Sequence, residues 1–596
     1  MPAESRKSID AALELNSVTK SFRTKARTVY ALNDVSVSAR RGIVTGIIGP
    51  DGAGKTTLMR LVAGLLTPDR GTISVLNLDA VLQPQHVQSI VGYMPQRFGL
   101  YEDLSVKENL DLYADLHAVR EADRAEHYSD LMRMTGLAPF MSRLAGKLSG
   151  GMKQKLGLAC SLVGTPPLLL LDEPTVGVDP VSRRELWAII HRLVEERSTT
   201  VLLSTAYLDE AERCNEVILL HEGRLLGQDE PAAFTRQLAG RSFHVFAPHI
   251  SKRALQERVS QAPGVLDAII QGSRVRVVTE HAVTPTAEQL VGDAATDVQI
   301  SPVAPRFEDS FVTLLKGSMD APSDSRLAPA FTAVAPSRTP DGEDVIVVRD
   351  LSRRFGDFYA VRNVSFTVGR GEVFGLLGAN GAGKSTTFRM LCGLLPASEG
   401  TLRVAGVDLR SAAAQARARV GYMAQKFSLY GDLSVVENLR FFSSAYRLKG
   451  ARQRERVEWA LAEFELAPFA DSTSRDLPLG FKQRLALAVA LMHEPDILFL
   501  DEPTSGVDPL GRREFWRRIN ALAERGITIM VTTHFMEEAE YCDRLVIMAQ
   551  GRILAHGTSE EMRARFRSDA LPNPTMEDAF VALIAAAENQ RMGDAA

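Results

Sequence analysis

Two glycine-rich segments carry the residue types that bind phosphate. One runs from Gly49 to Thr56 and the other from Gly378 to Ser385, and both follow an apolar run with the spacing G-x-x-x-x-G-K-[ST]. Glycines let backbone N–H groups curl round phosphates, the following helix N-terminus attracts the anion, the lysine reaches the β- and γ-phosphates, and the hydroxyl ligates Mg²⁺. The predicted phosphate-binding residues are Gly49, Gly52, Gly54, Lys55, Thr56 and Thr57 in the first segment and Gly378, Gly381, Gly383, Lys384, Ser385 and Thr386 in the second.

Two pairs of carboxylates suggest hydrolysis at these sites. Asp172 and Asp501 end apolar runs and are followed by Glu173 and Glu502. An aspartate at the tip of a strand suits Mg²⁺ binding, directly or through water, and the next carboxylate can orient and deprotonate an attacking water. The alternative is that Asp-Glu-Pro only caps the following segment. With a phosphate loop upstream in each case, we favour a catalytic role for Glu173 and Glu502.

These residues belong to two copies of one unit. GPDGAGKTT at Gly49 recurs as GANGAGKST at Gly378, 329 residues later, and the same offset carries LDEPTVGVDP at Leu171 onto LDEPTSGVDP at Leu500. The register holds without a gap from Gly49 to Trp187. A repeat of this length predicts two domains made from one template.

Each copy has the pattern of an α/β domain. Apolar runs at 42–49, 167–172 and 199–204 predict buried strands of a largely parallel sheet. Helical patterns at 55–66 and 181–196 lie between them. This alternation is typical of βαβ units, in which the ends of the strands carry the phosphate and carboxylate residues.

The composition changes between the copies. Residues 243–303 alternate short strand-like runs with a helical pattern and predict a small α+β unit that the second copy lacks. PRFEDSFVTLL (305–315) matches PTMEDAFVALI (574–584), which predicts a similar helix at the end of each copy. The expected organisation is a first nucleotide-binding domain (1–240), an α+β appendage with its helix (241–317), a linker rich in Pro, Ala and Ser (318–343), a second nucleotide-binding domain (344–570), and a C-terminal helix and tail (571–596).

The overall composition excludes several classes of protein. The chain has 596 residues, 45% apolar and 24% charged, which rules out wholesale disorder. A net charge of −4 argues against a protein that holds nucleic acid by positive charge, and four widely spaced cysteines exclude a disulfide scaffold. Neither a membrane-spanning run nor a secretory signal is apparent, so we expect a soluble, cytoplasmic chain.

Together, the phosphate loops, the segment LSGGMKQ (148–154), and the LDEP and VDP sequences resemble the nucleotide-binding domain of ABC-type ATPases. The resemblance covers most of both halves and implies two P-loop NTPase domains in tandem, with ATP and Mg²⁺ as cofactors. In that family two such domains face each other head to tail. Each ATP is then held between the P-loop of one domain and the signature segment of the other, here Ser149, Gly150 and Gly151 in the first half.

The resemblance also assigns residues outside the P-loops. Gln96 and Gln425 would contact Mg²⁺ or water and carry the signal to a partner. Phe22 and Phe355 fit the position of an aromatic ring that stacks on adenine, although a core phenylalanine is the alternative. The metal ligands that we expect are Thr56, Gln96 and Asp172 in the first half and Ser385, Gln425 and Asp501 in the second.

The two halves depart from the family pattern in different places. LPLGFKQ in the second half replaces LSGGMKQ, so that Pro478 stands where a serine hydroxyl should bind the γ-phosphate, and Leu479 replaces a glycine. Conversely, His534 occupies the switch position of the second half, where the first half has Ala206. That alignment requires one extra residue in the first half, near 195–198.

Head-to-tail pairing puts both departures in one composite site. Site one joins the first P-loop to the signature of the second half and contains Ala206, Pro478 and Leu479. Site two joins the second P-loop, Glu502 and His534 to the intact first signature. We therefore expect site two to hydrolyse ATP and site one to be impaired, with neutral drift and two active sites as the rival interpretation.

The favoured function is the ATP-hydrolysing subunit of a membrane exporter. The sequences YEDLSVKENL and YGDLSVVENL and the terminal ED-x-F-V helices resemble ABC-2-type multidrug exporters. That resemblance implies separate integral membrane permease subunits, two of them, as partners. The chain would lie on the inner face of a bacterial cell membrane and bind it only through the permease, without nucleic acid.

Two other classes of tandem ATPase compete with this interpretation. A factor acting on ribosomes would carry two intact signatures and a long, charged helical linker, and a DNA-repair ATPase would carry zinc cysteines or coiled-coil insertions. The broken second signature and the Pro/Ala/Ser-rich linker disfavour the ribosomal factor, and the sequence shows neither the zinc cysteines nor the coiled-coil insertions of the DNA-repair class. The cargo is not determined by these residues.

Overall fold

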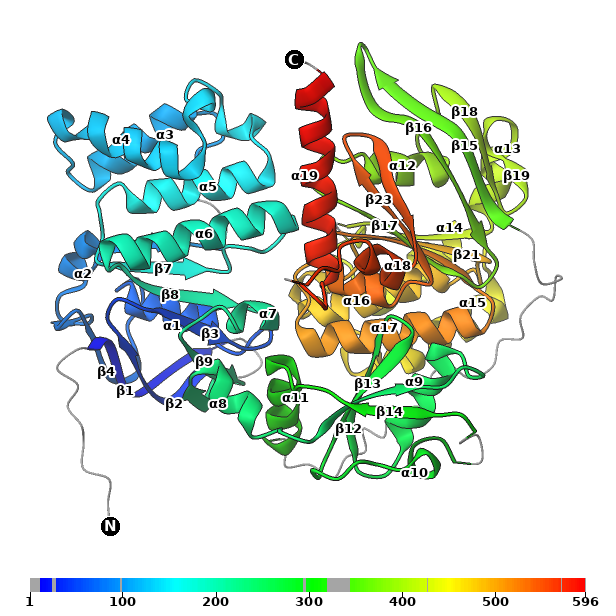
Figure 1. The fold of residues 1–596 in the computed structure, drawn as a ribbon, viewed down its shortest axis with the longest axis horizontal. Helices are drawn as coiled ribbons and strands as arrows, with labels where there is room; N and C mark the ends of the chain where they lie inside the picture. Colours follow the sequence, from blue (N-terminus) through cyan, green and yellow to red (C-terminus); the bar gives the residue numbers. More distant parts are fainter. Residues whose placement is uncertain are drawn as a thin grey trace.

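The computed structural model describes residues 11–23, 28–96, 99–292, 296–318, 344–425, 427–569 and 571–594. Two halves of similar architecture lie side by side, with the N-terminal half in blue to teal and the C-terminal half in light green to red (Figure 1). Most of the predicted linker at 318–343 lies outside the described residues. No helix in the described ranges is long and apolar enough to cross a membrane.

A six-stranded, largely parallel sheet forms the centre of each half, which confirms the predicted fold class. The strand order is β10-β9-β3-β8-β7-β6 in the first half and β20-β21-β22-β17-β23-β24 in the second, the same order read from the opposite edge. The strands of the first half are β3 (Val44–Ile48), β6 (Val91–Met94), β7 (Leu168–Asp172), β8 (Thr200–Thr205), β9 (Glu216–His221) and β10 (Arg224–Asp229). Those of the second half are β17 (Val373–Gly378), β20 (Val420–Met423), β21 (Ile497–Asp501), β22 (Thr528–Thr533), β23 (Arg544–Ala549) and β24 (Arg552–Gly557).

A smaller antiparallel sheet lies beside each central sheet and contributes the strand that borders the P-loop. Its order is β2-β1-β4-β5 in the first half and β16-β15-β18-β19 in the second. The strands are β1 (Ala11–Arg23), β2 (Thr28–Arg40), β4 (Arg70–Val75), β5 (Leu78–Asp79), β15 (Asp344–Phe355), β16 (Phe358–Gly369), β18 (Glu399–Val404) and β19 (Val407–Asp408).

Helices cover the central sheets and form a helical layer beyond them (Figure 1). In the first half these are α1 (Lys55–Val62), α2 (Pro84–Ile90), α3 (Val106–Leu116), α4 (Glu121–Thr135), α5 (Gly150–Leu162), α6 (Pro180–Arg197), α7 (Leu208–Ala211) and α8 (Pro231–Arg236). In the second half they are α12 (Lys384–Leu391), α13 (Leu409–Arg417), α14 (Val435–Ala445), α15 (Gly450–Glu463), α16 (Leu479–Leu491), α17 (Pro509–Glu524), η6 (Met536–Glu540) and α18 (Ser559–Ala564). Short 3-10 turns lie at η1 (Ala138–Phe140), η2 (Ala145–Lys147), η4 (Ala467–Phe469) and η5 (Ser474–Asp476).

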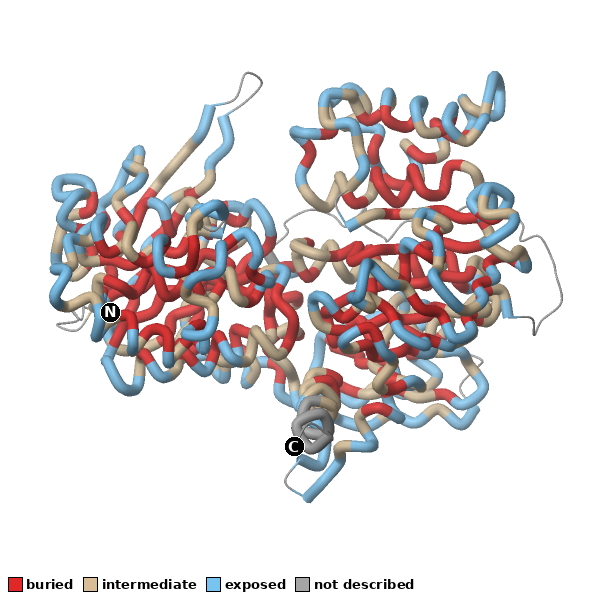
Figure 2. The backbone as a smooth tube through the Cα atoms, turned by 90° about the horizontal axis from the view of Figure 1, so that it is seen from above, coloured by how far each residue is buried: buried red, intermediate tan, exposed pale blue. Residues whose placement is uncertain are grey.

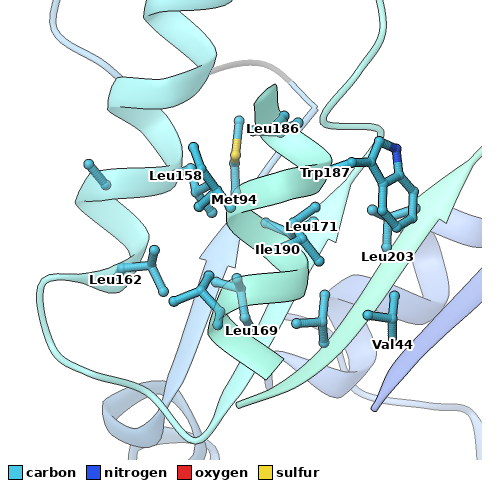
Figure 3. Close-up of a cluster of buried hydrophobic side chains, with 14 of the residues drawn as sticks. Val44, Met94, Leu158, Leu162, Leu169, Leu171, Leu186, Trp187, Ile190 and Leu203 are labelled. Carbon is cyan, nitrogen blue, oxygen red and sulfur yellow. The ribbon is translucent and has the colours of Figure 1, made fainter. Parts of the chain in front are cut away.

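The sheets are apolar because both of their faces are covered. Successive residues of β7 point to opposite faces, so Leu169 and Leu171 join the core beneath α5 and α6 while Leu168 and Leu170 join the core on the other side. Figure 3 shows the first of these cores, with Trp187 of α6 at its edge. Figure 2 shows that buried backbone, in red, fills the interior of each half.

The region between the halves folds as the predicted α+β appendage, with a four-stranded sheet of order β12-β13-β11-β14. Its elements are β11 (Ser242–Phe246), α9 (Lys252–Gln261), β12 (Val265–Gln271), β13 (Arg274–Thr279), α10 (Ala287–Val291) and β14 (Gln299–Pro302). The two predicted ED-x-F helices are α11 (Phe307–Ser318) and α19 (Met576–Asp594). Strand β12 was not among the sequence-based expectations.

The C-terminal segment of each half packs against the other half. The appendage lies below the second half in Figure 1, where Lys252 donates a hydrogen bond of 2.7 Å to the carbonyl of Cys542 and Arg253 pairs with Asp543. Helix α19 runs between the halves, and its Glu577 accepts a hydrogen bond of 2.9 Å from Arg184 of α6. These reciprocal contacts hold the two halves face to face.

Candidate nucleotide sites between the two halves

The first P-loop joins β3 to α1 and passes close to neighbouring backbone. A Cβ built on Gly49 would lie 2.3 Å from the carbonyl oxygen of Leu220, and one on Gly54 would lie 2.2 Å from that of Ala31. Gly54 also has φ of 103°, in the left-handed region that favours glycine. Glycine is therefore required at both positions, and the loop presents backbone rather than side chains.

The second P-loop joins β17 to α12 in the same way. A Cβ on Gly378 would lie 2.5 Å from the carbonyl oxygen of Met548, and one on Gly383 would lie 2.6 Å from that of Ala360. The middle glycines of the two loops, Gly52 and Gly381, have similar left-handed φ values of 79° and 81°. The two loops thus have one geometry, as their sequence repeat predicts.

The loops are built to receive phosphate. The buried amines of Lys55 and Lys384 donate hydrogen bonds of 2.8 and 2.7 Å to the carbonyls of Gly49 and Gly378, which holds each amine inside its loop. In the described part of the chain, neither α1 nor α12 has a side-chain N-cap or an acidic residue in its first turn. Their free N–H groups, including those of the first-turn residues Thr57 and Thr386, suit an anion.

The strand-tip aspartates lie beside the loops. The hydroxyl of Thr56 donates to Asp172 over 3.2 Å, and Ser204 donates to the same oxygen over 2.6 Å. The other carboxylate oxygen of Asp172 is buried and has no hydrogen-bond partner within the described ranges. An orphaned carboxylate oxygen next to a threonine hydroxyl is an arrangement that Mg²⁺ would satisfy.

The second half has a threonine, Thr532, in the place of Ser204. Thr532 donates to Asp501 over 2.5 Å, and Ser385 is the second residue of α12, as Thr56 is of α1. Burial, together with the neighbouring charge of Glu502, raises the pKa of Asp501 above its ordinary value. A cation would offset this desolvation, so the donor set fits a bound Mg²⁺.

The two glutamates share an uncommon backbone conformation. Glu173 and Glu502 have φ of 50° and 46°, in the left-handed region that residues with a Cβ seldom adopt. Their N–H groups donate to the hydroxyls of Ser204 and Thr532, each over 3.0 Å, which fixes the strained turn. Strain of this kind is held where it orients a functional side chain, here a carboxylate at the end of the sheet.

The two glutamines reach these glutamates. Gln96 donates to Glu173 over 2.5 Å, and Gln425 donates to Glu502 over 2.7 Å. The amide and the carboxylate of each half therefore lie together next to the P-loop lysine, which is 3.3 Å from the carboxylate in the first half and 3.9 Å in the second. The structure brings these sequence-predicted residues to one place in both halves.

The switch position distinguishes the halves. Nδ1 of His534 lies 3.2 Å from Oε2 of Glu502, and both side chains are buried. Burial alone would raise the pKa of Glu502, but the close approach of His534, aided by Lys384, holds this pKa below its ordinary value. Ala206 stands at the matching position of the first half, so Glu173 has an alanine methyl group there instead of an imidazole.

The signature segments differ in local structure as well as in sequence. Ser149 caps α5 by accepting a hydrogen bond of 3.3 Å from the N–H of Met152. Pro478 begins α16 and offers no hydroxyl. Leu479 extends toward the loop of its own half, because a Cβ on Gly506 would lie 3.3 Å from its side chain. Leu479 stands at the position that aligns with Gly150 of the first half, so a bulky side chain replaces a glycine there.

The halves meet head to tail at site two. Asn380 of the second P-loop donates a hydrogen bond of 3.1 Å to the carbonyl of Gly177, and a Cβ on Gly150 would lie 3.7 Å from the same amide nitrogen. The second P-loop thus faces the signature of the first half, as the family resemblance implies. Asp179 lies two residues after Gly177, and its negative charge favours the protonated form of Lys384.

Site one carries a further departure that the sequence analysis missed. Asp51 stands in the first P-loop at the position that Asn380 occupies in the second. Its ionised carboxylate cannot donate a hydrogen bond, whereas the amide of Asn380 can. Desolvation between the halves raises the pKa of Asp51 to about 6 against the attraction of Lys55, and the nearby carboxylates Glu173 and Asp508 add to the increase. The signal that could have revealed it is an aspartate aligned with an asparagine inside two otherwise similar loops.

The two aromatic candidates for adenine stacking lie at the ends of the antiparallel hairpins where the paired strands are connected. Phe22 pairs with Val29 and Phe355 with Phe358, two residues before Ala31 and Ala360, which border the P-loops. Phe22 is 42% exposed and Phe355 47% exposed. Both rings are thus available for stacking and do not belong to the core.

Comparisons with known proteins identify proteins that this chain resembles. The ABC transporter family matches residues 32–176 and 361–505. The chain is 52% identical over 575 residues to the "probable multidrug ABC transporter ATP-binding protein YbhF" of Escherichia coli (strain K12), covering 96% of this chain and 98% of that protein. It is 44% identical over 219 residues to the Nod factor export ATP-binding protein I of Cupriavidus metallidurans, covering 37% of this chain and 72% of that protein. A solved ATP-binding subunit of an ABC transporter, 32% identical, covers 40% of this chain and 99% of its own, with a TM-score of 0.37.

Proposed function

Because the chain belongs to the ABC transporter family, we propose that it is the energy-coupling subunit of an exporter whose membrane-spanning chains are separate polypeptides. It carries two ABC ATPase domains in tandem. The observation that supports the exporter assignment is the similarity to the multidrug ATP-binding protein of Escherichia coli along 96% of this chain. That relative is named a probable multidrug protein, and we propose drugs or other hydrophobic compounds as the cargo here.

The proposed chemistry is asymmetric. In site two, Glu502 takes the proton of the attacking water, and His534 and Gln425 hold that carboxylate in place. Mg²⁺ would be held by Ser385, Asp501 and Gln425 there, and by Thr56, Asp172 and Gln96 in site one. Site one binds ATP and hydrolyses it slowly or not at all, because it lacks the imidazole and the serine hydroxyl.

The proposed partners are two integral membrane permease subunits of the ABC-2 type. ATP-binding subunits of ABC transporters work with membrane permease components, and one chain of this protein already supplies two facing ATPase domains. We therefore propose one chain per transporter, peripheral on the inner face of a bacterial cell membrane.

A pull-down from detergent-solubilised host membranes tests this assignment. The bait is the full chain with Glu502→Gln, supplied with ATP to hold the closed state, and Lys384→Ala serves as a control that weakens ATP binding at site two. We expect one or two polytopic membrane proteins in stoichiometric amounts with the first variant and less with the second. Recovery of ribosomes without membrane proteins would overturn the exporter function in favour of a role in translation.

A further inference from the structure

The two switch segments meet at the centre of the molecule. Tyr207 follows Ala206 in the first half, and Phe535 follows His534 in the second. Their rings come from different halves, yet the ring centroids are 5.5 Å apart with the planes tilted by 56°. Both side chains are buried. The half that lacks a switch histidine therefore packs an aromatic ring directly against the neighbour of the histidine in the other half.

An arginine completes this contact. Cζ of Arg512 lies 4.6 Å from the centroid of Phe535 and 5.7 Å from that of Tyr207. Arg512 also pairs with Glu537 at 3.6 Å, and its counterpart in the first half, Arg183, pairs with Asp209 at 3.1 Å and with Glu577. The cluster thus takes Tyr207 from the first half, and Arg512 and Phe535 from the half that carries the switch histidine.

The cluster touches the proposed catalytic pair. The ring of Phe535 is centred 4.2 Å from that of His534, whose Nδ1 is 3.2 Å from Glu502. The imidazole thus lies between the ring of Phe535 and the carboxylate of Glu502, and both contacts bear on its orientation.

We infer that Tyr207 is a positioning residue for His534, supplied in trans by the half whose own switch histidine is replaced by Ala206. Its ring holds Phe535, and Phe535 holds the imidazole against Glu502. The hydroxyl is not required, because it has no hydrogen-bond partner within the described ranges. The inference rests on the proposed function, in which site two is the hydrolytic site.

The test compares Tyr207→Ala, Tyr207→Leu and Tyr207→Phe in the full chain by steady-state ATP hydrolysis. We expect kcat to fall roughly tenfold with alanine and less with leucine, while KM for ATP changes by less than about twofold and phenylalanine restores the rate. Tyr446→Ala is the matched control, because Tyr446 also stacks on a histidine, His493, at 3.8 Å but belongs to the helical layer. That control should leave kcat unchanged.

A double-mutant cycle with His534→Ala separates positioning from general loss of packing. Single-turnover rates at high enzyme concentration should show that Tyr207→Ala has no further effect once His534 is absent. An equal loss in both backgrounds, or an equal loss for Tyr207→Phe and Tyr207→Ala, would overturn the inference. If His534→Ala itself leaves hydrolysis intact, the asymmetric function fails instead, so the two failures are distinguishable.

Discussion

At the scale of single residues, Asp51 separates the phosphate loop of site one from that of site two. Asn380 donates to Gly177 across the interface, whereas Asp51 places a carboxylate near Lys55 of its own P-loop. Since the pKa of Asp51 is raised to about 6, it is mostly ionised at neutral pH and repels the nucleotide there. We therefore propose that site one is weakened at its P-loop as well as at its switch and signature.

Asp51→Asn should strengthen ATP binding at site one. The measurement uses a Lys384→Ala background, which suppresses ATP binding at site two. At pH 7.5 we expect site one to bind ATP about tenfold more tightly, because the substitution removes the negative charge of Asp51, which repels the negatively charged nucleotide. The advantage should shrink as the pH falls below 6, where the carboxyl of the unsubstituted chain becomes protonated. Asn380→Asp in a Lys55→Ala background is the mirror control and should weaken site two; an unchanged affinity in both would refute the electrostatic argument.

At the scale of elements, most of the site could be predicted because its parts are local. The P-loops, the strand-tip carboxylates and the signature segments each follow from a strand, a turn and a helix that are contiguous in sequence. Strand β12 (Val265–Gln271) could not be identified, since its residues are mostly half-buried and lack a clear alternation. The contact between Tyr207 and Phe535 was also beyond the sequence, because it depends on how the two halves dock.

Restoring the impaired elements should increase hydrolysis at site one. The test combines three substitutions, Ala206→His, Pro478→Ser and Leu479→Gly. In a Glu502→Gln background, which disables site two, we expect this triple variant to have a residual ATPase rate at least several-fold higher than the background alone. The substitutions return the imidazole beside Glu173, the hydroxyl at the start of α16, and the space that Leu479 fills next to Gly506. An unchanged rate in a folded protein would contradict the assignment of the impairment to these three positions.

At the scale of the whole molecule, two pseudo-symmetric ion-pair clusters link the halves. Glu577 of α19 pairs with Arg184 of α6 at 2.9 Å, and Glu308 of α11 pairs with Arg513 of α17 at 2.7 Å. The sequence repeats that predicted the two ED-x-F helices thus place equivalent acids on equivalent arginines across the interface. These contacts join the terminal helix of each half to the other half.

Glu577→Ala should destabilise this link. Burial would raise the pKa of Glu577, but the surrounding arginines lower it, so the ionised form stabilises the folded state above the ordinary pKa of a glutamate. Removing one partner of a largely buried pair costs about 2 kcal/mol or more, which corresponds to roughly 4–8 °C in unfolding temperature. Differential scanning calorimetry at pH 7.5 measures the difference in unfolding temperature between the variant and the unsubstituted chain.

The control for Glu577→Ala is Asp432→Ala, which breaks an exposed pair with Arg475 and should change the unfolding temperature by less than about 2 °C. The effect of Glu577→Ala should decrease as the pH falls through the lowered pKa of Glu577, where the acid becomes protonated in the unsubstituted chain. A pH-independent difference would show that the loss comes from packing and not from the ion pair.

The central claim, that one of the two composite sites hydrolyses ATP, is tested most directly by comparing Glu502→Gln with Glu173→Gln. The two glutamates share backbone conformation and glutamine partner but differ in the presence of the histidine. The measurement is steady-state ATP hydrolysis by the purified full chain. We predict that Glu502→Gln reduces kcat by roughly 100-fold or more and that Glu173→Gln retains at least about half of it. Comparable losses in the two variants would contradict the asymmetric account.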